Sequence, residues 1–561
     1  MLSTNSGHTE KEKATADRRI KLKKVHTAAA LWAFTLFRER IKIMKKSAKI
    51  FLSVILCLAV VFCSMMPAFA KEPKTAFVVV SGMNTFPLYK DGEKVFPTQT
   101  KTIMKLASKI ALPLVEFFKD NDYDKLGDAL FPAAAEAFDD LACNTDGSSK
   151  YDVSTDLFPL SAGNYPESFM NEVKDEGGVV KAGIEAFGAD NTYFFNYDWR
   201  LDPLKHADEL NKFIKNVKAQ TKCDRVALAA FSMGGTVTST YLYKYGSADV
   251  DSVSLCSTAF QGTTCMGSMF SGDLSIDAYG LIRRMAQLTR NDFLDELIMF
   301  LNEALEAYKI NASIDGYINN ILTNLNDRLY KELIIPVFGY MPGLWGLVDA
   351  ENYEKAKDFM LADADPTLVK SIDEYHYNVQ AKAYDILSSA QKDTTVYITA
   401  QYNMQGLPVS DTATNSNNDF LIDVDYASGG ATSARLGEML PEGYTQARAD
   451  GHDHLSADRQ IDASTCMLPE QTWFIRDMAH VDYNVGESTD FLIRLAKSEK
   501  QLTVSDSELY PQFMKYNSKT NTLSPVTEEL IKPTVISQIF AFLTKLVRLS
   551  AELIFSIIQP K

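Results

Sequence analysis

The middle of the chain alternates between short apolar runs and amphipathic stretches. Apolar runs lie within four segments, 75–84, 191–200, 225–231 and 250–260. Between the second and third, apolar residues recur at spacings of three and four, the period of a helix with one buried face: Leu204, Ala207, Leu210, Phe213, Ile214 and Val217. Strands that alternate with helices are typical of right-handed βαβ crossovers. The pattern therefore predicts an α/β fold with a mostly parallel sheet flanked by helices.

The alternation stops after the fourth run. From 262 to 392 the pattern is mostly helical, and strand-like runs return at 394–402 and 471–477. We therefore predict that 262–392 forms a helical cap, or lid, inserted into the sheet domain. The stretch 408–455 is rich in Asn, Asp, Gly and Ser, which is typical of a long excursion over the surface.

The first 70 residues differ from the rest in charge and hydropathy. They carry 13 Lys and Arg against 4 Asp and Glu, although the whole chain has a formal net charge of −15. From Met44 the sequence has three lysines, an apolar run over 50–66 and then Ala68-Phe69-Ala70, the order of a secretory signal peptide cleaved after Ala70. An uncleaved membrane anchor is the alternative. Because the segment 44–70 begins with its own Met, we interpret Met44 as the true start and residues 1–43 as an extension that results from a wrongly assigned start.

The remainder of the chain is acidic and can hold a large core. Because contacts with phosphate need clustered Lys and Arg, this acidity argues against a nucleic-acid partner. Apolar residues make up 46% of the sequence, so disorder is not expected over most of its length. Five cysteines follow the signal segment without CxxC spacing, which favours neither a disulfide framework nor a zinc site: Cys143, Cys223, Cys256, Cys265 and Cys466.

One serine stands between a strand-like run and a helix-like run. In the stretch RVALAAFSMGGTV, apolar residues lead to Ser232, and Gly234 and Gly235 follow it. Small residues at Ala230 and Gly234 let a strand and a helix pass closely around a sharp turn, as in the G-x-S-x-G elbow with Ala in place of the first Gly. Ser232 is therefore a candidate nucleophile. The alternative is a serine that caps a buried helix.

A serine hydroxyl needs a base before it can act as a nucleophile. His480 follows the strand-like run 471–477 and precedes a helix-like pattern, which places it at the carboxyl edge of the sheet, the same edge as Ser232. We therefore predict that His480 is the base. His452 and His454 lie in a polar loop and suggest an alternative role as a surface metal site, but the H-x-H spacing alone specifies such a site weakly.

The histidine in turn needs a carboxylate, which should lie between the serine and the histidine in the chain. Seven aspartates are candidates: Asp411, Asp419, Asp423, Asp425, Asp453, Asp458 and Asp462. We favour Asp458, because it precedes the apolar Ile461 and small residues just before the last strand. Most of the others are expected to be solvated loop carboxylates.

An acyl intermediate carries a negative oxygen, which two backbone N–H groups can stabilise. One donor is expected from Met233, the residue after the nucleophile. The other is expected from Met83 on the loop after the first strand, where Gly82 permits a tight bend. This chemistry requires no metal and no cofactor.

The same residues resemble the lecithin:cholesterol acyltransferase family of α/β-hydrolases. Tyr197-Asp198-Trp199-Arg200 matches a signature that precedes the serine elbow in that family, and the family's proline–glycine oxyanion turn corresponds to Ser81-Gly82-Met83 with the proline replaced. Its D-G-x-V acid motif corresponds to Asp458-Arg459-Gln460-Ile461, in which the glycine is absent, and its late histidine to His480. The resemblance covers roughly 75–500. It implies an α/β-hydrolase fold with a lid and an acyl ester substrate, often a lipid.

The C-terminal segment is amphipathic. Between 536 and 559, polar or small residues draw one narrow stripe on a helix, whereas Ile, Leu, Phe and Val fill the remaining face. The segment 531–561 is thus expected to be a helix that packs on the body or on a partner copy, or that lies on a lipid surface. Lys545 and Arg548 in its middle disfavour a membrane span.

These segments give a complete domain prediction. In chain order it comprises the extension, the signal peptide, the first part of the hydrolase core, the cap, the second part of the core, a linker and the C-terminal helix: 1–43, 44–70, 71–261, 262–392, 393–500, 501–530 and 531–561.

The expected function is that of an exported, secreted or cell-surface serine hydrolase or acyltransferase. An apolar segment around 338–348 and the C-terminal helix favour an acyl ester of a lipid as the substrate. A non-catalytic binding protein on a degenerate hydrolase fold and a serine peptidase are the alternatives.

Overall fold

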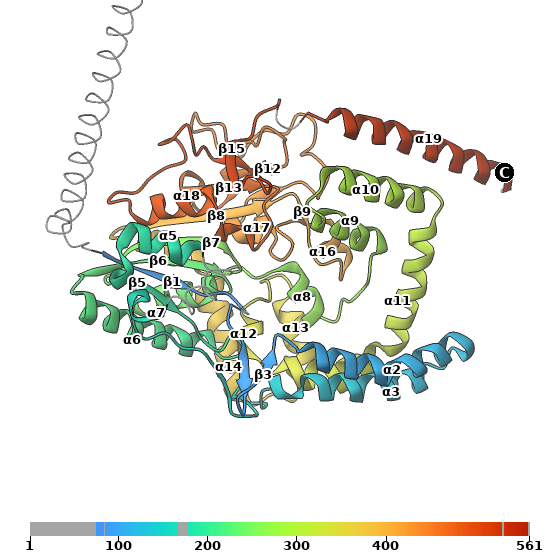
Figure 1. The fold of residues 1–561 in the computed structure, drawn as a ribbon, viewed down its shortest axis with the longest axis horizontal. Coiled ribbons are helices and arrows are strands. Elements are labelled where there is room, and N and C mark those ends of the chain that lie inside the picture. The colour runs from blue at the N-terminus through green and yellow to red at the C-terminus, as the bar shows by residue number, and fades with distance from the viewer. Residues whose placement is uncertain (1–74, 84, 167–177, 530–531, 559–561) are drawn as a thin grey trace, which may run out of the picture. The chain divides into compact units, whose positions relative to one another are not determined.

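The computed structural model of this chain describes residues 75–83, 85–166, 178–529 and 532–558. The expected signal peptide and upstream extension lie outside these residues. The described chain is built around an eight-stranded sheet in the order β15-β14-β13-β8-β7-β6-β1-β5 (Figure 1). Its strands are β1 Thr75–Val80, β5 Thr192–Phe195, β6 Arg225–Ser232, β7 Val250–Thr258, β8 Thr395–Tyr402, β13 Thr472–Arg476, β14 Phe513–Asn517 and β15 Thr522–Pro525.

All neighbouring strands of this sheet run parallel except β14 and β15, which pair antiparallel at one edge. The carboxyl ends of the parallel strands therefore meet along one edge of the sheet. The prediction of an α/β fold with a mostly parallel sheet flanked by helices is confirmed.

Both faces of the sheet are covered by helices. Along β1, Ala76, Val78 and Val80 enter one apolar cluster and Phe77 and Val79 enter another, as the two-residue period of a strand requires. The first face carries α6 Pro203–Thr221, α7 Gly234–Tyr245 and α15 Ala383–Ala390, and the second carries α5 Gly178–Phe187 and α18 Glu487–Ala496.

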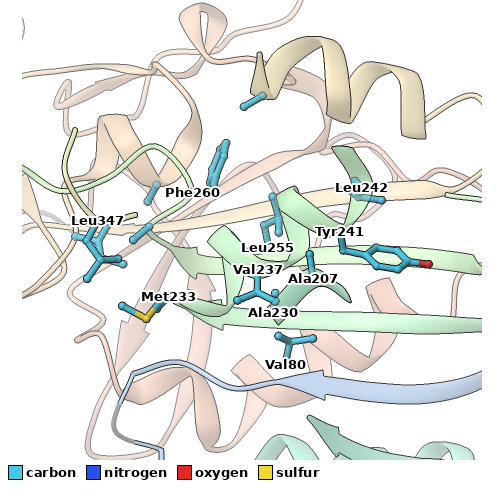
Figure 2. Close-up of a cluster of buried hydrophobic side chains, with 14 of the residues drawn as sticks. Val80, Ala207, Ala230, Met233, Val237, Tyr241, Leu242, Leu255, Phe260 and Leu347 are labelled. Carbon is cyan, nitrogen blue, oxygen red and sulfur yellow. The ribbon is translucent and has the colours of Figure 1, made fainter. Parts of the chain in front are cut away.

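The first apolar cluster lies directly beneath the turn that follows β6. Figure 2 shows Val80, Ala230, Met233 and Val237 in this cluster, together with Leu347 from the helical segment that follows β7. Because the side chain of Met233 is buried there, the turn is anchored on its inner side by dry packing.

The stretch 262–392 is helical, as its pattern predicts. It contains α8 Thr264–Phe270, α9 Ala278–Leu288, α10 Asp292–Ala307, α11 Ile310–Leu329, the π-helical turn η5 Tyr330–Gly339, α12 Pro342–Trp345, α13 Tyr353–Met360, α14 Pro366–Tyr375, the π-helical turn η6 His376–Gln380 and α15. Two long helices from the first part of the chain, α2 Thr100–Asp120 and α3 Tyr123–Phe138, join it, because Phe117 and Phe131 pack with Leu325 of α11. Figure 1 shows this helical pair beside α11.

Two of the predictions about segments are wrong. The segment 501–530 is not a linker, because β14 and β15 within it extend the sheet by two strands. The excursion 408–455 does not run only over the surface, because Phe420, Ile422 and Val424 are buried in its middle. It also forms two short helices, α16 Asp411–Asn415 and α17 Val424–Ser428.

The C-terminal helix α19, Val535–Ile558, lies along α10 (Figure 1). The ring of Phe540 contacts those of Phe293 and Phe300, and Arg548 forms an ion pair with Glu303. Among the described residues, no helix is both long enough and apolar enough to cross a membrane.

Candidate active site

Ser232 is the last residue of β6, and α7 begins two residues later. Its φ of 52° lies in the left-handed region, which residues other than glycine and asparagine rarely adopt. The side chain is half-buried. A serine held in a strained turn between a parallel strand and a helix projects its hydroxyl from the edge of the sheet.

The loop that follows β1 lies against this serine. A Cβ atom on Gly82 would stand 2.7 Å from the Cβ of Ser232, and one on Gly234 would stand 2.7 Å from the carbonyl oxygens of Val80 and Ser81. Glycine is therefore required at both positions for the two segments to pass. This close approach places the loop that carries Met83, one of the two predicted oxyanion donors, next to Ser232.

The strand order gives this place a further property. From β1 the chain crosses to β5 on one side and then returns to β6 on the other, so the loops after β1 and β6 leave the sheet in opposite directions. In open α/β sheets a ligand crevice forms at such a switch point, outside the carboxyl ends of the strands.

The residues Tyr197 to Arg200 hold the loop after β1 in place. The hydroxyl of Tyr197 donates to the carbonyl of Ser81 at 3.0 Å, and the hydroxyl of Ser81 donates to Asn196 at 2.9 Å. The guanidinium of Arg200 is fully buried and pairs with both carboxylate oxygens of Asp198, at 2.6 and 3.0 Å. Tyr197 therefore anchors the loop after β1, and Asp198 and Arg200 form a buried ion pair next to it in the chain.

His480 pairs with an aspartate, but not with the one predicted. Its Nδ1 lies 2.8 Å from Oδ2 of Asp419, and its backbone N–H donates to the carbonyl of Asp419 at 2.8 Å. Both side chains are buried, with 6% exposure for His480 and none for Asp419. This double contact fixes the ring and places the Nδ1 proton on the carboxylate side. Among the described residues, the other ring nitrogen, Nε2, has no hydrogen-bond partner.

The carboxylate of Asp419 is held in its charged form. Burial alone would raise the pKa of Asp419, but its electrostatic interaction with His480 and hydrogen bonds from His480, Ser257 and the Ile422 N–H bring the pKa below its ordinary value. Its Oδ1 accepts from the N–H groups of Leu421 and Ile422 at 2.9 and 2.8 Å. An ionised carboxylate in this position can stabilise a protonated imidazole.

Asp458, the predicted partner of His480, lies in a different ion pair. Its carboxylate contacts the guanidinium of Arg476 at the end of β13 and accepts from the hydroxyl of Tyr402 at 3.2 Å. A buried carboxylate takes the strongest donor within reach, and a guanidinium offers several. The prediction that Asp458 pairs with His480 is therefore wrong, and Asp419, another of the seven candidates, takes that place.

The loop that carries His480 reaches the end of β6. The ring of Tyr483 stacks on that of Phe231, the residue before Ser232, with centroids 4.2 Å apart. His480 itself lies 3.4 Å from the hydroxyl of Ser257, at the end of the neighbouring strand β7. Ser232 and His480 are thus on the same edge of the sheet, as their positions in the sequence predict.

Met233 takes the N-terminal position of α7 with helical dihedral angles. The first N–H groups of a helix have no partner within the helix, and the positive end of its dipole points to the same place. An N–H group at Met233 is therefore available at the turn, next to Ser232.

Sequence reasoning did not single out Ser257. It is fully buried, has a φ of 49°, and its hydroxyl contacts both Asp419 and the side-chain oxygen of Gln401. The only signal in the sequence is a polar pair, Ser257-Thr258, at the end of an apolar strand. Ser257 therefore helps to hold the carboxylate of Asp419 in place.

No protein-family model matches this chain, and no curated protein matches it. Function must therefore be inferred from the residues of the site.

Proposed function

We propose that this chain is a serine hydrolase or acyltransferase with an α/β-hydrolase fold, and that it acts on acyl esters. The observation that supports this most strongly is the buried Asp419–His480 pair on the same sheet edge as the strained Ser232. A buried ionisable pair is costly to fold unless its groups are well paired, so its position on the same sheet edge as Ser232 favours a chemical role.

In the proposed reaction the hydroxyl of Ser232 attacks the carbonyl carbon of the ester. Nε2 of His480 takes the hydroxyl proton, and Asp419 stabilises the imidazolium that forms. The N–H groups of Met233 and Met83 stabilise the tetrahedral oxyanion. His480 then gives its proton to the departing alcohol, and the acyl group stays on Ser232. Water gives hydrolysis, and a second alcohol gives acyl transfer.

A lipid ester is the proposed substrate class, and the helical segment 262–392 is the proposed lid. Apolar side chains on α2 are exposed although they belong to a folded helix: Ile103, Met104, Leu112, Val115 and Phe118. An exposed apolar face of this kind suits contact with a lipid surface. In keeping with such a substrate, we propose that the chain is exported through residues 44–70 to a secreted or cell-surface location.

Labelling with a fluorophosphonate probe tests the proposal, because only an activated serine reacts with it. The wild-type protein should be labelled and should cleave a short p-nitrophenyl ester, and Ser232→Ala should lose both. Ser108→Ala, at an exposed position of α2, is the matched control and should keep both. A wild-type protein that is folded but neither labelled nor active would favour a non-catalytic binding protein. Cleavage of amide but not ester substrates would favour a peptidase.

A further inference from the structure

A second cluster of ionisable side chains lies outside the serine site. His452 and His454 stand in the polar loop that ends the excursion 408–455, and Glu470 lies in the 3₁₀ turn η8, Pro469–Gln471, before β13. The fold brings these three side chains together, with one ligand atom of each within 4.8 Å of the others. Among the described residues, this is the group of His, Cys, Asp and Glu that meets that distance.

The distances within the cluster match those between ligands of one small cation. Oε1 of Glu470 lies 3.3 Å from Nδ1 of His452 and 3.6 Å from Nε2 of His454. A second carboxylate oxygen, Oδ2 of Asp450, lies 3.1 Å from the same Nε2. Two ligands of a tetrahedral zinc ion, each about 2.1 Å from the metal, are about 3.4 Å apart.

The orientation of the His454 ring is fixed from behind by Gln512. The side-chain N–H₂ of Gln512 donates to the carbonyls of Pro469 and Thr472 at 2.7 and 3.2 Å, so its oxygen must face His454. That oxygen lies 3.0 Å from Nδ1 of His454 and can only accept, so Nδ1 carries the proton. The other nitrogen, Nε2, faces the carboxylates of Asp450 and Glu470.

A ring nitrogen that faces two carboxylate oxygens needs a positive charge there, which either a second proton on the ring or a bound cation supplies. His454 is fully buried, so water does not screen the charge of the carboxylates at the ring. An acceptor that takes the other ring N–H of a histidine, and so fixes its tautomer, is the usual support of a metal-bound imidazole. His452 is about half exposed, with a side-chain exposure of 48%, which leaves an entry path for an ion.

We propose that His452, His454 and Glu470 bind a divalent transition-metal ion of the zinc class, with Asp450 beside the site. Two imidazole nitrogens and a carboxylate suit Zn²⁺ better than Mg²⁺ or Ca²⁺, which take oxygen ligands. The ion would join the excursion that carries Asp419 to the sheet, since Glu470 lies just before β13 and Gln512 just before β14. Its role is to hold that excursion in place, and it does not depend on the proposed hydrolase activity.

Zinc binding to the purified, untagged protein tests this proposal directly. After treatment with EDTA and exchange into metal-free buffer, titration of Zn²⁺ against a fluorescent zinc chelator should show one ion bound per chain. Glu470→Gln and His452→Ala, both at partly exposed positions, should each weaken the affinity by at least about 10-fold. Asp453→Asn, on the same loop, is the matched control, because its side chain caps the N–H of Leu455 and stays exposed.

A readout that does not use affinity separates the ion from a merely structural cluster. X-ray absorption of the zinc-loaded protein should show two imidazoles in the first shell, and one in the folded His452→Ala variant. The proposal is overturned if the wild-type protein binds no zinc, or if the two ligand variants bind it as tightly as the Asp453→Asn control does.

Discussion

At the scale of single residues, the acid that serves His480 is decided by what else each carboxylate contacts. Asp419 is buried against His480 and Ser257, whereas Asp458 is committed to Arg476. The sequence places several aspartates between Ser232 and His480, and it does not reveal which of them a guanidinium will take. The position of His480 at the carboxyl edge of the sheet could be predicted because it follows a recognisable strand, but the carboxylate that pairs with it depends on the folding of a long polar excursion.

Exchange of either acid for its amide separates the two roles. Asp419→Asn should lower kcat for a soluble ester by about 10⁴-fold, because the amide no longer stabilises the imidazolium or selects the right tautomer. Asp458→Asn should keep a kcat near that of the wild-type protein and lose stability, because it removes one of the two carboxylates that pair with the largely buried Arg476 and leaves only Asp477. The measurements are steady-state kinetics and urea unfolding. A greater loss of kcat in Asp458→Asn would restore the first assignment.

The pKa of Asp425 predicts how the stability of the folded protein changes with pH. Burial and the negative charge of Asp423 raise the pKa of Asp425 to about 7. A raised folded pKa means that the folded state binds the proton more tightly than the unfolded state, so stability falls as pH rises from about 4 to about 7 and then levels off. Asn keeps the acceptor for the N–H of Tyr426, at 3.2 Å, and has no charge to bury.

Asp425→Asn should therefore gain stability over the wild-type protein, and the gain should be larger at pH 8 than at pH 5. Urea unfolding at the two pH values measures it. An equal difference at both would show that Asp425 titrates alike in the folded and unfolded protein.

At the scale of elements, strands with long apolar runs could be predicted and the edge of the sheet could not. β6 and β7 are covered on both faces, so each appears in the sequence as a nearly continuous apolar run. β15 has the sequence TLSP and is partly exposed, so only its pairing with β14 makes it a strand. The helix α2 was not predicted for a related reason, because Phe117 on its buried face packs with Leu325 of α11, far away in the chain.

The close packing of α7 against the end of β1 requires that position 234 has no side chain. Gly234→Ala should destabilise the protein by at least about 1–3 kcal/mol and abolish activity, because its Cβ would meet two backbone oxygens that cannot move aside. Gly316→Ala is the matched control. It lies exposed in α11 with open space around it, and should stabilise the protein by about 0.5–1 kcal/mol. Urea unfolding measures both, and equal effects would contradict the close packing.

At the scale of the whole molecule, the face of α19 that points away from α10 is relevant to the proposed contact between the protein and lipid. The polar residues Ser537 and Arg548 bond to Glu296 and Glu303 of α10, so part of the polar stripe faces the body. Apolar residues at helical spacing stay exposed on α19: Val535, Ile539, Phe542, Leu546, Leu549 and Leu553. A row of large apolar side chains left in water is uncommon unless it contacts another surface.

If that row lies on lipid, charges placed within it should weaken binding to vesicles without touching the site. We expect the double variant Phe542→Asp and Leu549→Asp to bind anionic phospholipid vesicles at least about 10-fold more weakly, because it loses buried apolar area and gains repulsion from the headgroups. Its kcat for a soluble ester should not change. Glu552→Gln, exposed on the same helix, is the control and should bind as the wild-type protein does. Co-sedimentation measures the binding. Unchanged binding of the double variant would mean that this row serves another contact, such as a second copy of the chain, which sedimentation velocity would then detect.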